Sequence, residues 1–463
     1  MIAAPEGPGP SPWVDDNDVA LLTDLYELTM IDAYLAEGLE EEAVFSLFVR
    51  RLPRRRNHLV ACGLELALSV LERLHFSEGA LSYLASLGLF SERLLSWLRD
   101  FEFKGDVYAV PEGTPVFPLE PILEVVAPLP QAQLVETILM NQVHFQTVAA
   151  SKAARMVCAA AGRTVVDFGA RRMPGSDAGV KVARAAYVAG LDSTSNVLAG
   201  HLFGIPVAGT MAHSYVQAHA TQLDAFRAFA RRYPYTVLLV DTYDSLGGVR
   251  DVVRLARELG PAFHVKAVRL DSGDLLELSH SARRLLDEAG LHQVGIFASG
   301  GLNEDAIAQL VRKGAPIDGF GVGTALGVSE DAPALDMAYK LVSYAQRGCI
   351  KLSPGKALMP GRKQVFRLED GGGRAQGDLV ACHDEAGSGR PLLTQAMRSG
   401  RRARPAPSLE AIRALARVER DRLPQRLVAL EPAEPPYRVD ISPRLAAARD
   451  ALAARLAPSP AVT

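Results

Sequence analysis

The segment VRLDSGDL (268–275) combines a guanidinium group with two carboxylates. Arg269 and Asp271 are two residues apart, so on an extended chain their side chains point to the same side. Asp271 and Asp274 flank a Ser-Gly pair, which permits a tight turn with carboxylates for Mg²⁺ or sugar hydroxyls. An ordinary Asx turn is the alternative. The segment DTYD (241–244) supplies two more carboxylates at an equivalent position, and acidic residues at two such positions suit a magnesium-pyrophosphate ligand.

The segment DFGARRMPGSDAG (167–179) places an aromatic ring and two arginines just after a predicted strand. Arg171 and Arg172 carry the planar donors that suit a carboxylate or a phosphate. Phe168 offers a flat face for an aromatic ligand. A loop with solvent-facing arginines is an equally good interpretation of this segment alone.

The segment GTMAHS (209–214) places His213 at the end of another predicted strand, three residues after Thr210. An imidazole can act as an acid, as a base, or as a nucleophile that carries a phosphoryl group. A lone histidine is more often structural, but a position at the rim of a barrel favours a functional role.

Two glycine-rich turns follow late strands of the chain, SGG (299–301) and GFGVGT (319–324). Backbone N–H groups in such turns can hold a phosphate, and glycine permits its close approach. Packing within a barrel is the alternative use of glycine. Neither turn matches a P-loop or a GxGxxG dinucleotide motif. The candidate phosphate-binding residues are Gly300, Gly301, Gly321, Gly323 and Thr324.

These motifs are positioned by a repeated pattern that begins after Gly162. Short β-branched runs alternate with helical stretches, and each run has a polar tail at its carboxyl end. Alternation of this kind predicts a parallel α/β sheet, here a barrel, with its site at the C-terminal rim. The predicted runs are 164–169, 206–213, 236–244, 264–274, 294–301 and 317–324.

The regions outside the predicted barrel have a different pattern. We divide the chain into a loose leader (1–18), a helical and β-rich part (19–130), the barrel (131–348) and a C-terminal part (349–463). In residues 105–128, apolar and polar residues alternate between prolines, which predicts short antiparallel strands. A long helix is predicted at 131–161. The C-terminal part contains a predicted hairpin, a helix starting near Ser408 and four arginines within 398–404, which we assign to a solvated surface.

Composition excludes several classes of protein. The 463 residues include 50 basic and 53 acidic side chains, so no global field attracts nucleic acid or an anionic membrane. The four cysteines form no CxxC pair, which fits a reducing compartment. The first residues do not read as a secretion signal, and no apolar run approaches the roughly 20 residues that span a bilayer. We therefore expect a cytoplasmic protein.

Taken in order, the motifs resemble nicotinate phosphoribosyltransferases. The resemblance begins at TDLYELTM (23–30), runs through DFGARR, GTMAHS, VRLDSGDL, ASGGLNE and GVGTALG, and closes with KLSPGKALMPGRKQVFR (351–367). It implies a type II architecture, which is an irregular parallel α/β barrel plus a smaller β-rich domain formed from N- and C-terminal segments. It also implies a homodimer in which a tyrosine of one subunit, Tyr26 here, completes the site of the other.

The resemblance assigns a nicotinate pocket. Tyr26 and Phe168 would stack on the two faces of the pyridine ring. Arg269, with Thr210, would hold the nicotinate carboxylate. In the similar nicotinamide enzyme the family pattern implies an aspartate at the position of Ser195. A hydroxyl there removes repulsion against a carboxylate and removes the partner of an amide, which predicts the acid as substrate.

The resemblance also implies the remaining chemistry. Phosphoribosyl pyrophosphate would enter with Mg²⁺, Arg171 would contact phosphate, and Asp271 would hold the metal or the ribose hydroxyls. The 5′-phosphate would lie on the two glycine turns. ATP would phosphorylate His213, and hydrolysis of this phosphohistidine would drive synthesis of nicotinate mononucleotide and pyrophosphate for NAD salvage.

Three alternatives remain open. The chain could be a phosphoribosyltransferase acting on nicotinamide or on quinolinate, although quinolinate would need more cations than this pocket offers. It could be a catalytically idle homologue that binds a nucleotide. A sugar-phosphate aldolase or isomerase barrel is poorly supported, because only Lys266 lies near a Schiff-base position.

Overall fold

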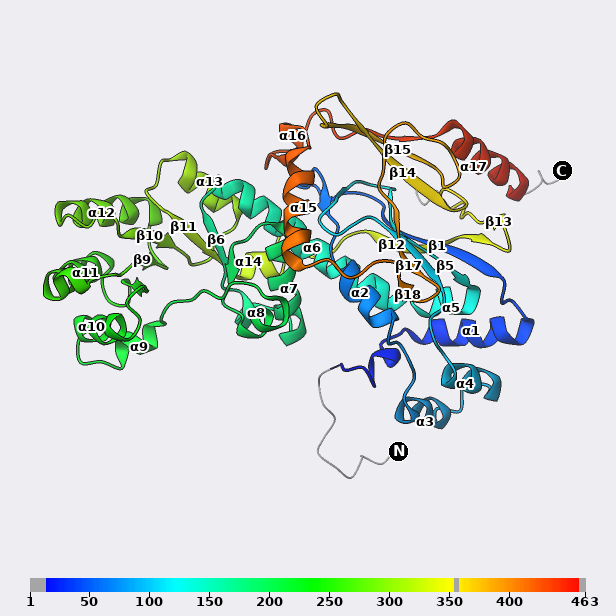
Figure 1. Cartoon of the computed structure of the whole chain (residues 1–463), viewed down its shortest axis with the longest axis horizontal. Coiled ribbons are helices and arrows are strands. Elements are labelled where there is room, and N and C mark those ends of the chain that lie inside the picture. Colours follow the sequence, from blue (N-terminus) through cyan, green and yellow to red (C-terminus); the bar gives the residue numbers. More distant parts are fainter. Residues whose placement is uncertain (1–13, 354–357, 458–463) are drawn as a thin grey trace, which may run out of the picture.

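A computed structural model describes residues 14–353 and 358–457 of the chain. Most of the predicted leader and a few residues of the KLSPGKALMPGRKQVFR segment therefore lie outside the described residues. Figure 1 shows two parts side by side. A parallel sheet with its helices lies on the left, a group of antiparallel sheets lies on the right, and α6 (Glu136–Ala160) lies between them.

The left part is built on a six-stranded sheet in which every neighbouring pair is parallel. Its strand order is β7 (Ser193–Thr194), β6 (Thr164–Asp167), β11 (Gly319–Val322), β10 (Gly295–Ala298), β9 (Ala267–Leu270) and β8 (Val237–Leu239). Helices follow the strands: α7 (Ser176–Ala189), α8 (Val197–Phe203), α9 (His213–Gln217), α10 (Gln222–Arg232), α11 (Ser245–Leu259), α12 (Leu275–Glu288), α13 (Glu304–Arg312) and α14 (Thr324–Gly327).

This sheet confirms the predicted parallel α/β architecture, with one correction. Residues 206–213 do not form a strand, and within the described residues only the bridge between Thr194 and Val207 joins this segment to the sheet. Pro206 lacks an N–H donor and Gly209 disfavours extended pairing, which is why a strand does not propagate here. Strands β7 and β8 are the two edges of the sheet, so the barrel is open as judged by hydrogen bonding.

The right part confirms the predicted β-rich domain formed from both ends of the chain. A seven-stranded sheet has the order β13 (Arg347–Gly348), β12 (Met337–Tyr344), β1 (Glu42–Val49), β5 (Pro121–Pro128), β3 (Asp106–Ala109), β17 (Thr394–Arg398) and β18 (Arg401–Arg402). A second sheet has the order β16 (Arg390–Pro391), β14 (Lys363–Glu369), β15 (Ala375–Cys382) and β19 (Val439–Ile441). Strands β2 (Leu59–Val60) and β4 (Pro115–Val116) form a short pair. Strand β12 lies inside the range predicted for the barrel, yet it pairs with β1.

Most of the remaining helices pack around the β-rich part, whereas α15 (Leu409–Asp421) packs mainly on α7. The others are α1 (Leu25–Glu37), α2 (Leu64–Leu71), α3 (Glu78–Ser86), α4 (Glu92–Arg99), α5 (Leu129–Leu134), α16 (Gln425–Val428) and α17 (Pro443–Leu456), with short 3₁₀ turns at Val19–Leu21, Ala170–Arg172 and Gly260–Ala262. The predicted long helix is divided at Val135 into α5 and α6. Helix α6 contacts α13 and α14 on the parallel-sheet side and β2 and β12 on the other side.

The arginine-rich segment 398–404 is not wholly solvated, contrary to the sequence-based assignment. Arg402 contacts the carboxylates of Glu65 and Glu72, and Nε of Arg402 lies 3.1 Å from Oε2 of Glu72. These two glutamates belong to the region of α2, which the sequence alone did not place beside this segment. Among the described residues, no helix is long and apolar enough to cross a membrane.

Candidate active site

A cavity of about 540 Å³ lies at the carboxyl ends of β6, β9, β10 and β11. The structure brings almost all of the predicted site residues to its wall: Phe168, Arg171, Arg172, Ser195, Thr210, His213, Arg269, Asp271, Gly300, Gly301, Gly321, Gly323 and Thr324. Parallel strands end at one edge of their sheet, so motifs far apart in the chain meet there. Tyr26 alone among the predicted residues lies elsewhere.

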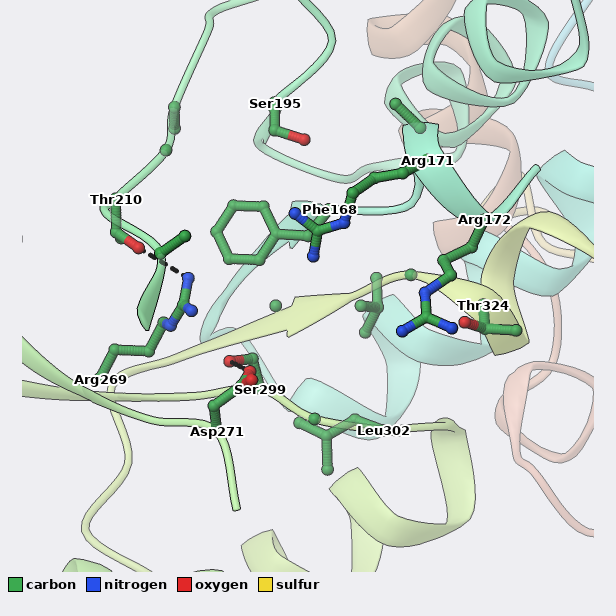
Figure 2. Close-up of a pocket in the computed structure, with 18 of the residues that line it drawn as sticks. Phe168, Arg171, Arg172, Ser195, Thr210, Arg269, Asp271, Ser299, Leu302 and Thr324 are labelled. Carbon is green, nitrogen blue, oxygen red and sulfur yellow. Dashed lines mark hydrogen bonds between the residues drawn. The ribbon is translucent and has the colours of Figure 1, made fainter. Parts of the chain in front are cut away.

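Phe168 follows β6 and presents its ring to the cavity (Figure 2). The buried carboxylate of Asp167 shapes the turn, because it accepts hydrogen bonds from the N–H of Gly169 at 2.8 Å and from the hydroxyl of Thr194 at 2.7 Å. Burial raises the pKa of Asp167, and these two bonds oppose that shift. A Cβ atom on Gly321 would lie 2.5 Å from Cδ2 of Phe168, so the ring occupies space that only glycine leaves open.

Arg269 lies on β9, beside Thr210 at one side of the cavity (Figure 2). Its Nη1 donates a hydrogen bond of 2.6 Å to Oγ1 of Thr210, and its guanidinium lies 5.8 Å from the centroid of the Phe168 ring. Burial lowers the pKa of Arg269, while Asp271 and Asp241 oppose that shift. Its Nε is buried without a hydrogen-bond partner. Removal of this cation from water makes it a strong partner for an anionic ligand.

Asp271 lies at the end of β9, and both of its carboxylate oxygens have neighbours. Oδ1 accepts a hydrogen bond from the hydroxyl of Ser299, and Oδ2 lies 4.0 Å from Nε2 of His213. The main chain is held by Asp241, whose Oδ2 accepts from the N–H of Asp271 at 3.0 Å and from the hydroxyl of Ser272 at 2.5 Å. The Asp271 side chain is therefore aimed into the cavity by strand ends on both sides of it.

The other acidic residues of these motifs have structural roles. Asp274 caps α12, because its Oδ1 accepts from the N–H groups of Leu276 at 3.0 Å and Glu277 at 3.2 Å. Asp244 caps α11 through the N–H of Gly247 at 2.6 Å. The Asx-turn alternative thus describes Asp274, while Asp271 lines the cavity.

His213 is the first residue of α9 and lies opposite Asp271. Its Nδ1 lies 3.2 Å from Oγ1 of Thr242, within hydrogen-bond distance. The imidazole side chain is 42% exposed, so a soluble co-substrate can reach Nε2. Sequence reasoning did not identify Thr242 or Ser299 as supporting residues. Each lies beside a residue that had been singled out, which is the signal that could have found them.

The first glycine turn lies against the end of β9, and the second lies against the turn that carries Phe168. Gly300 has φ of +92°, and a Cβ atom there would lie 1.9 Å from the carbonyl oxygen of Asp271. Gly301 also has a positive φ, of +67°, and opens toward the cavity. Gly323 and Thr324 begin α14, and Figure 2 shows Arg172 extending toward Thr324. The arrangement offers backbone donors and arginine side chains to one anionic group.

Tyr26 lies on α1 and lines a different cavity, of about 690 Å³, with Glu136, His144 and Lys181. It is 47% exposed. Burial of part of the ring, followed by the nearby charges of Glu136 and Glu27, raises the pKa of Tyr26. A single chain therefore does not bring Tyr26 to the Phe168 cavity, and its predicted role in a second subunit stays a prediction.

No group of three or more His, Cys, Asp or Glu side chains is placed to hold a metal ion within residues 14–353 and 358–457. A divalent cation at this site would need ligands from a substrate. Asp271 fits such a partial ligand set, since Mg²⁺ commonly takes one or two carboxylates together with substrate phosphates.

Comparison with known proteins agrees with this geometry. Residues 21–144 match the family model of the nicotinate phosphoribosyltransferase N-terminal domain, and residues 164–347 match that of the nicotinate phosphoribosyltransferase family. A nicotinate phosphoribosyltransferase of Mycobacterium tuberculosis is 55% identical over 427 residues, which is 92% of each chain. The enzyme of Bacillus subtilis is 43% identical over 379 residues, which is 80% of this chain and 77% of that one. The crystal structure of human nicotinic acid phosphoribosyltransferase superimposes with a TM-score of 0.82 at 29% identity, and covers 93% of this chain and 99% of that one.

The open parallel sheet, the antiparallel domain built from both chain ends and the cavity lined by Arg171, Arg172 and Arg269 define an α/β phosphoribosyltransferase. Within that class, the chain belongs to the nicotinate phosphoribosyltransferase family.

Proposed function

We propose that this protein transfers the phosphoribosyl group of 5-phosphoribosyl 1-pyrophosphate to the ring nitrogen of nicotinate, which forms nicotinate mononucleotide and releases pyrophosphate. One observation carries the proposal: the Arg269–Thr210 pair faces the Phe168 ring on one side of a cavity whose other side holds two glycine turns. A site for a flat anionic ring thus adjoins a site for a phosphate.

The acid is the substrate that this cavity fits. The nicotinate carboxylate pairs with Arg269, and the pyridine ring packs on Phe168. Ser195 lines the same cavity and places no negative charge there. Nicotinamide would give up the ionic bond to Arg269, and quinolinate would bring a second carboxylate to a pocket that offers its ring one buried guanidinium.

Phosphoribosyl pyrophosphate lies with its 5′-phosphate on the turns of Gly300–Gly301 and Gly321–Thr324. The pyridine nitrogen attacks C1 of the ribose as the bond from C1 to the pyrophosphate oxygen breaks, through an oxocarbenium-like transition state. Arg171, exposed at the rim, contacts the departing pyrophosphate. Bound Mg²⁺ would neutralise charge on the pyrophosphate. Asp271 orients the ribose hydroxyls or shares that cation.

His213 couples ATP to the reaction. With Nδ1–H donating to Thr242, Nε2 keeps its lone pair and attacks the γ-phosphorus of ATP, which releases ADP. Hydrolysis of the phosphohistidine then yields inorganic phosphate and restores His213. The contact with Thr242 holds the ring in this orientation.

The enzyme works as a homodimer with shared sites. Tyr26 is half-exposed beside the exposed side chains of Leu22 and Leu25, in a cavity of its own chain that lacks the Arg269–Phe168 pair. A second copy supplies the Tyr26 ring to the free face of nicotinate. The reaction takes place in the cytoplasm, where the four free cysteines would stay reduced.

The deciding experiment is a product assay with nicotinate, phosphoribosyl pyrophosphate and Mg²⁺, with and without ATP. Nicotinate mononucleotide is expected, with nicotinamide and quinolinate as poor substrates under the same conditions. Preferred turnover of nicotinamide or quinolinate would overturn the substrate assignment. Labelled ATP should leave an acid-labile phosphate on the wild-type chain and none on His213→Ala. An unlabelled wild-type chain that also forms no product would support the idle-homologue alternative.

A further inference from the structure

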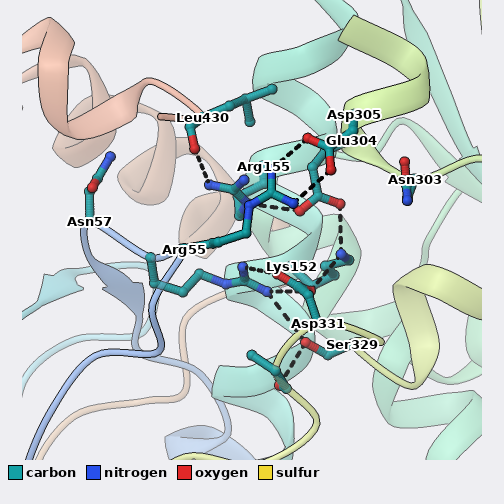
Figure 3. Close-up of polar contacts among 12 residues, drawn as sticks. Arg55, Asn57, Lys152, Arg155, Asn303, Glu304, Asp305, Ser329, Asp331 and Leu430 are labelled. Atoms are coloured by element: carbon teal, nitrogen blue, oxygen red, sulfur yellow. Dashed lines mark hydrogen bonds and ion pairs between the residues drawn. The ribbon is translucent and has the colours of Figure 1, made fainter. Parts of the chain in front are cut away.

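Five charged side chains form a group that we call the Lys152 cluster: Arg56, Lys152, Arg155, Glu304 and Asp331. Figure 3 shows Lys152 between Glu304 and Asp331. Nζ of Lys152 lies 2.6 Å from Oε2 of Glu304 and 2.7 Å from Oδ1 of Asp331. Nε of Arg155 lies 2.8 Å from Oε1 of Glu304, and Nη1 of Arg56 lies 2.6 Å from Oδ2 of Asp331. Three cations thus face two carboxylates, and Lys152 joins the two carboxylates to each other.

Four of the five side chains are buried, and Asp331 lies at the edge of the cluster with its side chain 21% exposed. Glu304 is 1% exposed and Lys152 is 2% exposed. Burial alone would raise the pKa of Glu304, but contacts with Arg155 and Lys152 hold it below its usual range, so Glu304 stays ionised at neutral pH. Because burying charges carries a desolvation penalty of several kcal/mol per ion, such a cluster is a weak source of stability. The clear consequence of the cluster is that it fixes the positions of the chain segments that carry these side chains.

The two carboxylates lie just downstream of the two glycine turns. Glu304 is the first residue of α13 and follows Gly301 by three positions. Asp331 follows α14, which begins at Thr324. Helix α6 carries Lys152 and packs on both α13 and α14. One ammonium group therefore holds the chain segments that leave both turns against a single long helix.

We propose that Lys152 is a positioning residue that sets the distance between the two glycine turns and thereby tunes the site for the 5′-phosphate of phosphoribosyl pyrophosphate. This inference rests on the proposed function. Lys152 does not line the cavity and touches no substrate. Its effect reaches the phosphate through Glu304 and Asp331, whereas Arg269 and Thr210, which would hold the nicotinate carboxylate, belong to other elements.

The variant Lys152→Met isolates this effect. Without the ammonium group, Glu304 keeps Arg155 and Asp331 keeps Arg56, so every remaining charge of the cluster has an opposite partner. Methionine has a similar length and fills the vacated space without a charge. We therefore expect a folded protein whose two turns are tied to each other only by the pairing of β10 with β11.

A matched control is Arg55→Gln. Arg55 pairs with Asp305 at 2.6 Å, next to Glu304 at the start of the same helix, but the two side chains are 42% and 50% exposed. Loss of an exposed pair of this kind has little effect on its surroundings. Substrate kinetics of this variant should match those of the wild type.

The experiment is steady-state kinetics for both substrates, together with calorimetric titration of ribose 5-phosphate. In Lys152→Met, KM for phosphoribosyl pyrophosphate and Kd for ribose 5-phosphate are expected to rise roughly tenfold to a hundredfold, because small misplacements of binding groups have effects of this size. KM for nicotinate should stay at the wild-type value. Equal changes in KM for the two substrates would overturn the inference. A lower Tm with unchanged KM for phosphoribosyl pyrophosphate and unchanged Kd for ribose 5-phosphate would also overturn it.

If Lys152→Met does not fold, Lys152→Arg keeps the charge and changes only the geometry. A rise confined to the phosphoribosyl substrate supports positioning, and unchanged kinetics refute it. Failure of the proposed function is distinguishable, since it would appear as a wild-type chain that forms no nicotinate mononucleotide. Failure of this inference alone would leave wild-type turnover intact and the ratio of the two KM values unchanged in the variant.

Discussion

Nη1 of Arg269 donates a hydrogen bond to Oγ1 of Thr210 at 2.6 Å, and this bond joins β9 to the loop that leads to His213. The guanidinium is thereby held 5.8 Å from the centroid of the Phe168 ring. A carboxylate bound in the cavity would accept charge-assisted hydrogen bonds from this guanidinium. The Arg269–Thr210 hydrogen bond explains how a buried guanidinium can be held in position to bind an anionic ring.

Arg269→Met should abolish this carboxylate site. A charge-assisted hydrogen bond contributes about 1.5–3 kcal/mol, so kcat/KM for nicotinate should fall by about 10- to 100-fold. Thr210→Val, which removes only the partner hydroxyl, should have a smaller effect in the same direction. KM for phosphoribosyl pyrophosphate is the internal control. Unchanged nicotinate kinetics in Arg269→Met would show that the acid binds elsewhere.

Ser195→Asp should shift the substrate preference from acid to amide. The new carboxylate would repel nicotinate and offer an acceptor to the amide N–H₂ of nicotinamide. We expect kcat/KM for nicotinate to fall about tenfold or more while that for nicotinamide rises. Competition between the two substrates in one assay measures the change directly. The prediction fails if both values fall together.

Gly300→Ala should damage the site beyond its effect on stability. The added Cβ would lie 1.9 Å from the carbonyl oxygen of Asp271, so the end of β9 must move. We expect a loss of about a hundredfold in kcat/KM. Gly290→Ala is the matched control, because it too has a positive φ, +75°, but meets nothing within 4 Å. It should lower stability by about 1 kcal/mol and leave activity intact.

The free energy of unfolding should decline as pH rises toward neutrality, because α1 contains a buried carboxyl group. Glu27 is fully buried and accepts hydrogen bonds from Thr23 at 2.6 Å and Thr137 at 2.7 Å. Burial raises its pKa to about 7, against an ordinary value of 4.5. Between these two values the folded chain holds a proton that the unfolded chain has lost, so the free energy of unfolding declines with pH by up to about 3 kcal/mol.

Denaturant unfolding at several pH values tests this titration. In Glu27→Gln the decline between pH 5 and 8 should be reduced relative to the wild type. Glu37→Gln, at the exposed end of the same helix, serves as control and should follow the wild-type curve. A variant and wild type with identical pH dependence would show that Glu27 does not titrate in this range.

Much of the cavity could be predicted from the sequence, because its residues lie at the ends of apolar runs. Such residues include Phe168, Arg269, Asp271 and Gly300, which lie at or near the end of a strand made mainly of β-branched or apolar residues. Parallel strands bring such ends to one edge whatever the intervening helices contain. The hairpin of β14 and β15 and the helix after Ser408 were predictable for the same reason, since their signals are local.

Other features depended on contacts that no local signal reports. Residues 206–213 read as a strand but contribute only the bridge at Val207. Asp274 and Asp271 look alike in the sequence, yet one caps a helix and the other lines the cavity. Arg402 was assigned to solvent but lies between two glutamates of the region around α2.

The sequence by itself determined five of the six predicted parallel strands, the residues at their carboxyl ends and the family to which the chain is similar, since these follow from short-range periodicity and ordered motifs. Only the tertiary structure decided that Ser299 supports Asp271, that Tyr26 lies away from the cavity of its own chain, and that Lys152 connects Glu304 with Asp331. The reason is physical: such contacts join segments far apart in the chain, and they form where helices and strands pack, at positions that the local pattern of residues does not specify.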